Sequence, residues 1–155
     1  MKCLILAGGF GRRLQAVIGD QPKALLEYRG KPLISHIIDR IPRDLEIMIS
    51  TNKRFEPLFQ AWSLSASRPV EILVENARSE EEKLGSLAAI SYWVQNRDIR
   101  EDLMVIAADN YFEFDLQKMI AAYNGKNTLV ATYEIGDKIK AREFGVVKLD
   151  GRKIT

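Results

Sequence analysis

Residues 2–14 read KCLILAGGFGRRL, an apolar run that passes directly into a turn rich in glycine and arginine. A short, continuous apolar run such as residues 2–7 predicts a strand that is buried on both faces, as in parallel sheets. Glycines leave backbone N–H groups open to an anion, and arginine side chains offer planar forks that suit phosphate oxygens. The opening of the chain therefore predicts a buried strand followed by a phosphate-binding loop.

Strand and helix patterns alternate along the next hundred residues. Apolar runs predict further strands at residues 46–51, 70–75 and 103–108. Apolar residues at helical spacing predict helices at residues 32–41, 54–62, 85–97 and 116–123. This alternation predicts an α/β fold with a mostly parallel sheet and helices on both faces, and such sheets bind ligands outside the carboxyl ends of their strands.

The pattern changes after Asn127. Residues 128–135 and 144–149 are strand-like, and Asp150-Gly151 is a two-residue turn signal that leads into residues 152–155. We therefore expect a C-terminal antiparallel hairpin. Neither a repeat nor a low-complexity linker divides the chain, so we expect residues 1–155 to form a single domain.

Composition indicates an ordinary globular protein. Of the 155 residues, 46% are hydrophobic and 28% are charged, which excludes the disordered class. The apolar run 103–108 is far shorter than the roughly 20 residues that cross a bilayer, and the run before Gly8 is too short for a signal peptide. The single cysteine, Cys3, suits a small buried hydrophobe in a reducing compartment. We expect no membrane partner and a cytoplasmic location.

Charge is unevenly distributed. The net charge of +2 is too small to indicate a nucleic-acid partner. Residues 1–31, however, carry six basic and two acidic side chains. This segment predicts a local cationic site for an anionic ligand.

The glycine loop differs from two common nucleotide-binding motifs. Leu14 stands where the dinucleotide-binding fingerprint has its third glycine, and no glycine lies five residues before Gly30-Lys31, as a Walker A loop requires. Downstream, Pro22 restricts the backbone next to Lys23, whose ammonium can reach a phosphate as a point charge.

Together these segments resemble the sugar-1-phosphate nucleotidylyltransferase family. Residues 6–14 (LAGGFGRRL) and 22–25 (PKAL) match its signature L-x-G-G-x-G-x-R-L, spacer, P-K-x-L, with Arg12 where many members have threonine. Three later segments are similar to family segments in the same order, namely residues 84–90 (LGSLAAI) to L-G-T-A-G-A-I, 107–112 (AADNYF) to G-D-N-x-F, and 144–147 (FGVV) to Y-G-V-V. The resemblance spans essentially the whole chain.

The resemblance implies a three-layer Rossmann-like fold and an enzyme of the EC 2.7.7 type. In the family reaction a sugar 1-phosphate oxygen attacks the α-phosphorus of a nucleoside triphosphate, assisted by Mg²⁺, and pyrophosphate leaves. The implied roles are catalysis for Arg13 and Lys23, Mg²⁺ binding for Asp109, nucleotide binding for Leu6, Ala7, Gly8, Gly9, Gly11, Arg12, Gly85 and Ser86, and sugar-phosphate binding for Asn110, Phe144 and Gly145. The expected partners are a nucleoside triphosphate and a sugar 1-phosphate.

Two alternatives stay open. Catalytic domains of the family continue into an E-K-P stretch and a second metal-binding aspartate, which these 155 residues do not contain, so the chain could be a fragment or a non-catalytic nucleotide-binding module. A molybdenum-cofactor guanylyltransferase-like enzyme would share L-A-G-G and K-A-L-L, but Arg13-Leu14 and Pro22-Lys23 favour a sugar phosphate. The base, the sugar and a homo-oligomeric state are left open.

Overall fold

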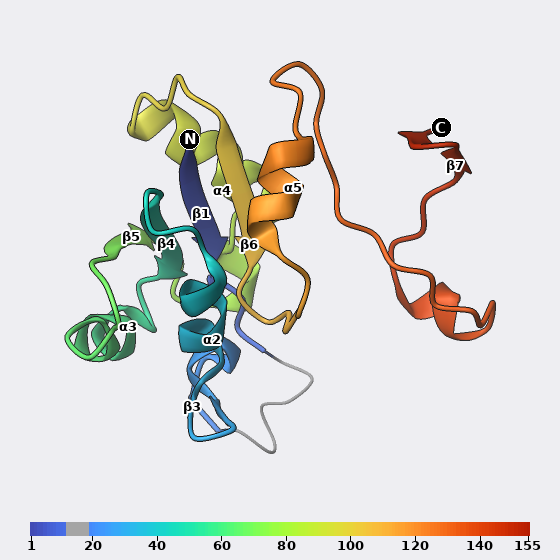
Figure 1. The fold of residues 1–155 in the computed structure, drawn as a ribbon. Coiled ribbons are helices and arrows are strands. Elements are labelled where there is room, and N and C mark those ends of the chain that lie inside the picture. The colour runs from blue at the N-terminus through green and yellow to red at the C-terminus, as the bar shows by residue number, and fades with distance from the viewer. Residues whose placement is uncertain (12–18) are drawn as a thin grey trace. The chain divides into compact units, whose positions relative to one another are not determined.

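The computed structural model describes residues 1–11 and 19–155 and divides the chain into two compact units (Figure 1). The first unit is Met1–Gly125 and the second is Lys126–Thr155. The single domain expected over residues 1–155 remains a prediction. All four long strands belong to the first unit.

A four-stranded parallel sheet forms the centre of the first unit. Its strands are β1 (Lys2–Leu6), β4 (Glu46–Asn52), β5 (Glu71–Glu75) and β6 (Leu103–Ala107), in the order β5-β4-β1-β6. Within this sheet Leu4 pairs with Met48 on one side and with Val105 on the other, and every pairing is parallel. The four strands expected from the sequence are confirmed. Because the strand order reverses at β1, a crevice is expected at its carboxyl end.

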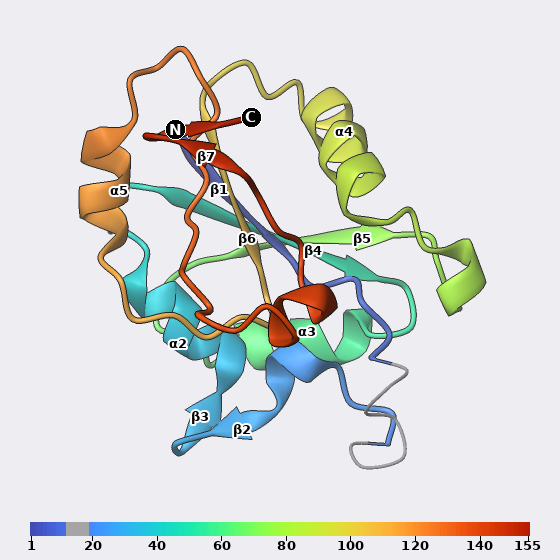
Figure 2. The ribbon, with the colours of Figure 1, turned by 90° about the vertical axis from the view of Figure 1, so that its right-hand side faces the viewer.

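Among the residues that the structure describes, four α-helices cover the two faces of the sheet. They are α2 (Leu33–Arg40), α3 (Glu56–Ser63), α4 (Ser86–Asn96) and α5 (Leu116–Ala122), and they confirm the helices expected from the sequence. Buried residues of α2, α3 and α5 pack with Cys3 and Ile5, whereas Trp93 of α4 packs with Leu4 on the other face. In Figure 2, α4 lies across β4 and β5 from α2 and α3. None of the helices that the structure describes is long and apolar enough to span a membrane.

Cys3 lies in the middle of this packing. Its side chain is fully buried in β1, which pairs on both sides. Burial raises the pKa of the Cys3 thiol to about 12, since the thiolate would lose its hydration. The expectation of a small buried hydrophobe at this position is confirmed.

A short hairpin that the sequence analysis did not expect precedes α2. Its strands are β2 (Glu27–Tyr28) and β3 (Lys31–Pro32), which pair antiparallel. The two residues between them, Arg29 and Gly30, have φ values of 49° and 83°. A two-residue turn with positive φ at both positions matches the twist of the flanking strands, and glycine adopts it without strain.

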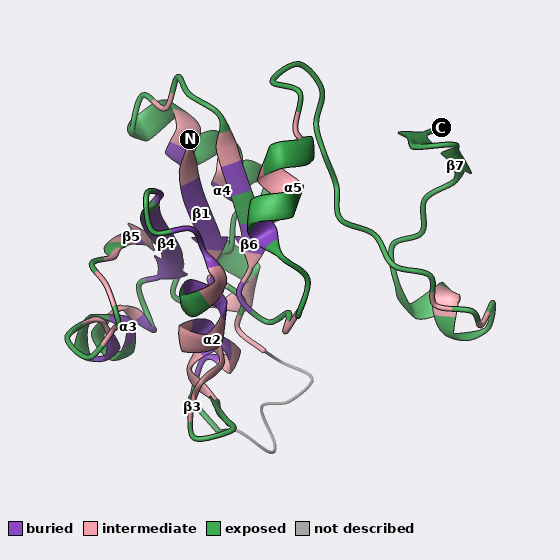
Figure 3. Cartoon of the chain, in the orientation of Figure 1, coloured by how far each residue is buried: buried purple, intermediate pink, exposed green. Residues whose placement is uncertain are grey.

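The second unit departs from the expected strands. It contains η4 (Lys140–Glu143), β7 (Leu149–Asp150) and β8 (Lys153–Ile154), and the last two form the expected antiparallel hairpin. Asp150 pairs with Lys153, so the turn is Gly151-Arg152, one residue later than expected. The prediction of a strand at residues 128–135 was wrong. Of residues 144–149, also expected to form a strand, only Leu149 is in one. Alternating apolar residues do not suffice where no partner strand satisfies the backbone, and no residue of this unit is buried (Figure 3).

Truncating the core at Phe59 should destabilise the first unit. Phe59 of α3 is fully buried, and we expect Phe59→Ala to lower the free energy of unfolding by about 3–5 kcal/mol because it leaves a cavity. Leu64 is 90% exposed, so Leu64→Ala is the matched control and should change stability by less than about 0.5 kcal/mol. Urea unfolding of both variants measures this difference; equal losses would contradict the packing described here.

Candidate active site

The glycine loop begins where β1 leaves the sheet. Ala7 N–H still donates to the Ser50 carbonyl at 2.7 Å, and Gly8 is the next residue. The fully buried Asn52, at the end of β4, donates from Nδ2 to the Gly8 carbonyl at 3.0 Å and accepts from Phe55 N–H at 3.0 Å. Asn52 therefore fixes the first residue of the loop. The sequence analysis missed this residue, although it directly follows a predicted strand.

A cavity of about 220 Å³ opens at this edge of the sheet. Its walls come from the glycine loop, from η2 (Lys23–Leu25), from the ends of β5 and β6, and from the start of α4. The lining residues are Leu6, Ala7, Gly8, Gly9, Gly11, Lys23, Ala24, Glu75, Lys83, Gly85, Ser86, Ala89, Ala107, Ala108 and Asp109. The cavity therefore lies at the reversal of strand order, where an open α/β sheet is expected to bind its ligand.

Most of the predicted site residues meet in this cavity. Those lining it are Leu6, Ala7, Gly8, Gly9, Gly11, Lys23, Gly85, Ser86 and Asp109. Asn110 follows Asp109 in the chain but is not among the lining residues, and Phe144 and Gly145 belong to the second unit. Arg12 and Arg13 lie outside the described residues.

Lys23 and Asp109 bring opposite charges together inside the cavity. Lys23 Nζ lies 3.8 Å from Asp109 Oδ2, and the two side chains are 31% and 53% exposed. An ion pair this long and this open to water contributes little free energy. Both groups can therefore exchange this contact for a phosphate or a cation at low cost.

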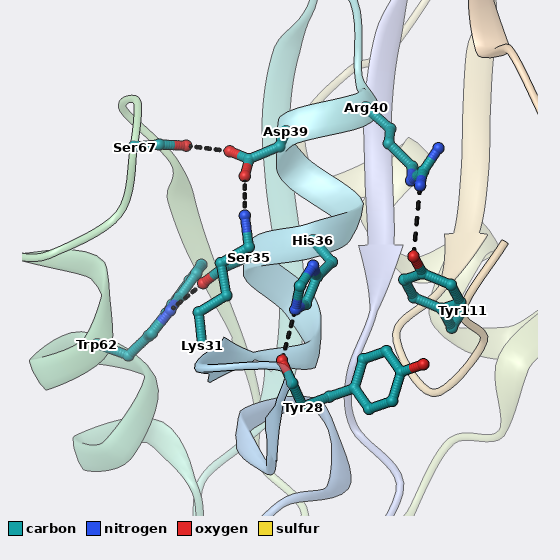
Figure 4. Close-up of polar contacts among 9 residues, drawn as sticks. All are labelled: Tyr28, Lys31, Ser35, His36, Asp39, Arg40, Trp62, Ser67 and Tyr111. Atoms are coloured by element: carbon teal, nitrogen blue, oxygen red, sulfur yellow. Dashed lines mark hydrogen bonds and ion pairs between the residues drawn. The ribbon is translucent and has the colours of Figure 1, made fainter. Parts of the chain in front are cut away.

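Helix α2 holds the loop that follows Asp109 (Figure 4). Arg40 donates to the Tyr111 hydroxyl at 3.4 Å and to the Glu113 carbonyl at 3.3 Å. The Tyr111 ring forms T-shaped contacts with the rings of Tyr28 and His36, whose centroids lie 5.1 and 5.9 Å from its own. His36 in turn contacts the Tyr28 carbonyl through Nε2 at 2.6 Å. The loop beginning at Asp109 is thus packed against a helix instead of extending into water.

Glu75 places a buried carboxyl group in the cavity wall. It ends β5, is 5% exposed, and accepts a hydrogen bond from Ser50 Oγ at 2.6 Å through Oε1. Burial raises the pKa of Glu75, and the Ser50 bond opposes this rise. The sequence analysis missed Glu75 as a site residue, although it is the last residue of a predicted strand and such ends meet at the binding edge.

Asp109 and Glu75 are the carboxyl groups among the described residues that line the cavity, and they belong to no preformed metal cage. Within residues 1–11 and 19–155, no group of three or more His, Cys, Asp or Glu side chains could together hold an ion. Mg²⁺ commonly uses one or two carboxylates and completes its shell with water and substrate phosphates. Asp109 in the cavity fits that mode, in which the ion arrives with the phosphates.

Comparison with known proteins identifies the family. A family model described as nucleotidyl transferase matches residues 2–155. The chain belongs to the nucleotidyl transferase family. This confirms the resemblance drawn from the glycine loop and the lysine segment.

Among curated relatives, the D-glycero-alpha-D-manno-heptose 1-phosphate guanylyltransferase of Campylobacter jejuni is 26% identical over 97% of this chain and 64% of its own. The mannose-1-phosphate guanyltransferase of Pichia angusta is 27% identical over 85% of this chain and 37% of its own.

Solved structures agree on the fold of this nucleotidyl transferase. HddC from Yersinia pseudotuberculosis, complexed with GMP-PN, is 27% identical and superposes with a TM-score of 0.60 over 78% of this chain and 53% of its own. A Bacillus anthracis protein described as a glucose-1-phosphate thymidylyltransferase, 23% identical, shares the fold with a TM-score of 0.74 over 99% of this chain and 62% of its own. The chain spans 32–64% of the length of eight curated relatives that it matches.

A methyl group added at Gly8 should disturb this nucleotidyl transferase, whereas one added at Gly9 should not. A Cβ at Gly8 would lie 3.2 Å from Glu75 Oε1, which Ser50 holds in place, while a Cβ at Gly9 meets nothing within 4 Å. We expect Gly8→Ala to cost about 1–3 kcal/mol of stability and Gly9→Ala to leave stability nearly unchanged. Thermal unfolding of the two variants tests this, and equal effects would contradict the close approach at Gly8.

The raised pKa of Glu75 predicts a pH-dependent effect of Glu75→Gln. Burial disfavours the charged form of Glu75, so its pKa is higher in the folded chain than the ordinary value of 4.5 that applies in the unfolded chain. The folded chain therefore keeps the Glu75 proton to higher pH. The contribution of Glu75 to the free energy of unfolding is fully present below pH 4.5. It is lost as the pH rises through the pKa that Glu75 has in the folded chain. Glutamine does not titrate, so the variant should gain stability relative to the parent between pH 4 and 7.5. Unfolding free energies at both pH values measure this, and a constant difference would count against it.

Proposed function

We propose that this chain transfers a nucleoside monophosphate from a nucleoside triphosphate to a sugar 1-phosphate and releases pyrophosphate. The observation that carries the proposal is the cavity in which the glycine loop, Lys23 and Asp109 meet. Its family membership and its guanylyltransferase relatives support the same reaction. We place the reaction in the cytoplasm, where nucleoside triphosphates are available.

The reaction needs positioning and charge neutralisation more than a protein nucleophile. An oxygen of the sugar 1-phosphate forms a bond to the α-phosphorus while the bond to the bridging oxygen of pyrophosphate breaks. The attacking oxygen is already anionic, so no general base has to remove a proton. Backbone N–H groups of the glycine loop and the Lys23 ammonium would hold the phosphates in line and stabilise their charge.

Further roles follow the family pattern. We propose that Arg13 binds the triphosphate, that Arg12 adds charge to the same loop, and that Asn110, Phe144 and Gly145 contact the sugar phosphate. Asp109 would hold Mg²⁺, which supplies further neutralisation of phosphate charge when bound. A single carboxylate suffices for this role when the phosphates provide the remaining ligands.

The geometry of Glu75 favours guanine as the base. A buried carboxylate accepts two hydrogen bonds side by side, and guanine presents adjacent N1–H and N2–H donors. Adenine presents an N1 lone pair at that edge, which a carboxylate repels. Glu75 shares the cavity with Gly85 and Ser86, which the family resemblance assigns to nucleotide binding, and several relatives are named guanylyltransferases or guanyltransferases. We therefore propose GTP as the nucleotide substrate.

A nucleotide-binding module without turnover is the second candidate. It is favoured by the lack of a cluster of three or more metal-ligating side chains among the described residues. Such a module would bind GTP with Mg²⁺ but release no pyrophosphate. The two candidates therefore differ in one measurement.

Pyrophosphate release tests the proposal directly. The purified chain with Mg²⁺, each nucleoside triphosphate and a panel of hexose and heptose 1-phosphates should release pyrophosphate with GTP and one sugar phosphate. Lys23→Met should lower kcat by about 10²–10³-fold, as expected when a group that stabilises transition-state charge is removed. Lys53→Met is the control, because Lys53 pairs with Glu56 and does not line the cavity. A change of less than about threefold in Lys23→Met, with pyrophosphate still released, would refute the role of Lys23.

A further inference from the structure

A buried chain of hydrogen bonds leads from α4 to the carboxyl group in the cavity wall. Trp93 Nε1 donates to Ser50 Oγ at 2.7 Å, and Ser50 Oγ donates to Glu75 Oε1 at 2.6 Å. The three residues come from α4, β4 and β5, and their exposed fractions are 6%, 1% and 5%. We call this set the Trp93–Ser50–Glu75 relay.

The chemistry of the donors gives the relay one direction. An indole N–H can only donate, so the Ser50 oxygen must accept from Trp93. The single hydroxyl proton of Ser50 is then directed at Glu75, and Oε1 can only accept. A proton on Glu75 would therefore have to sit on Oε2. The relay leaves Oε1 no freedom to become a donor.

The relay also fixes where the carboxyl group points. Glu75 Oε1 and Oε2 lie 3.2 and 3.6 Å from the position that a Cβ would occupy on Gly8, so both oxygens border the glycine loop. The bond from Ser50 restrains rotation of the carboxyl group at that place. A carboxylate held in this way presents acceptors in a constant geometry to a ligand in the cavity.

We propose that Ser50 and Trp93 are positioning residues for base specificity, which hold Glu75 as an oriented acceptor so that the cavity selects a base with two adjacent N–H donors. The inference rests on the proposed function, because it assumes that a nucleotide base reaches Glu75. Without the relay, the carboxyl group can rotate and, when protonated, can donate from either oxygen, and bases without both donors then bind nearly as well. Ser50 and Trp93 act only through Glu75 and touch no substrate.

Binding of GTP and ITP distinguishes this role from a purely structural one. The two nucleotides differ only in the 2-amino group, so their affinity ratio reports the second hydrogen bond to Glu75. We expect the parent chain to bind GTP about tenfold more tightly than ITP, as one hydrogen bond to a charged group allows. Ser50→Ala should bring this ratio close to one while ITP affinity changes little. Isothermal titration calorimetry with Mg²⁺ present gives both constants.

Trp93→Phe provides a second variant, which keeps an aromatic ring in the core but removes the N–H together with the pyrrole part of the indole. It should lower the GTP/ITP ratio in the same direction as Ser50→Ala. Trp62→Phe is the matched control, since Trp62 Nε1 donates to Ser35 Oγ at 3.1 Å and packs in the cluster on the opposite face of the sheet. The control should leave the ratio unchanged.

The outcomes separate this inference from the proposed function. Ratios in Ser50→Ala and Trp93→Phe within about twofold of the parent value, or an equal drop in Trp62→Phe, would overturn the relay. A parent chain that releases pyrophosphate but binds GTP and ITP equally would overturn the relay and leave the transferase activity standing. A parent chain that binds no nucleoside triphosphate would overturn both.

Discussion

The parallel pairing of β1 with β4 on one side and β6 on the other is the constraint on which the rest of this structure depends. It brings three carboxyl ends to one edge, and with them the glycine loop, Asn52 and Asp109. A shift of one residue in either register would turn the apolar side chains of that strand to the wrong face and move these groups away from the loop. The core and the cavity are therefore set by the same backbone hydrogen bonds.

The buried polar groups are concentrated near this edge and not spread through the core. Ser50, Thr51, Asn52 and Glu75 are the buried polar residues among those described, and all four lie in the last part of β4 or β5. An apolar residue at such positions would make the folded chain more stable, because a buried carboxyl group loses its hydration. Asn52 and Glu75 lie beside Gly8, which fits the proposed binding role of this edge of the sheet at the expense of stability.

Much of the first unit could be predicted from periodicity, because its strands and helices each bury a face whose pattern is local. The glycine loop, Lys23 and Asp109 could be predicted to meet because parallel strands end at one edge. Glu75 and Asn52 were missed because a carboxyl or amide group at a strand end looks like an ordinary turn residue until its neighbours are known. The strand expected at residues 128–135 failed for a related reason, since alternation describes one strand and pairing needs another.

The burial of Cys3 means that the reactivity of its thiol depends on local opening of the core. With a thiol pKa of about 12 and no exposed surface, Cys3 has almost no reactive thiolate at neutral pH while β1 stays paired on both sides. A thiol reagent can attack only after the core cluster that buries Cys3 beneath α2, α3 and α5 has opened. The rate at which this single cysteine is modified therefore measures how often the core around β1, the strand that leads into the glycine loop, opens transiently.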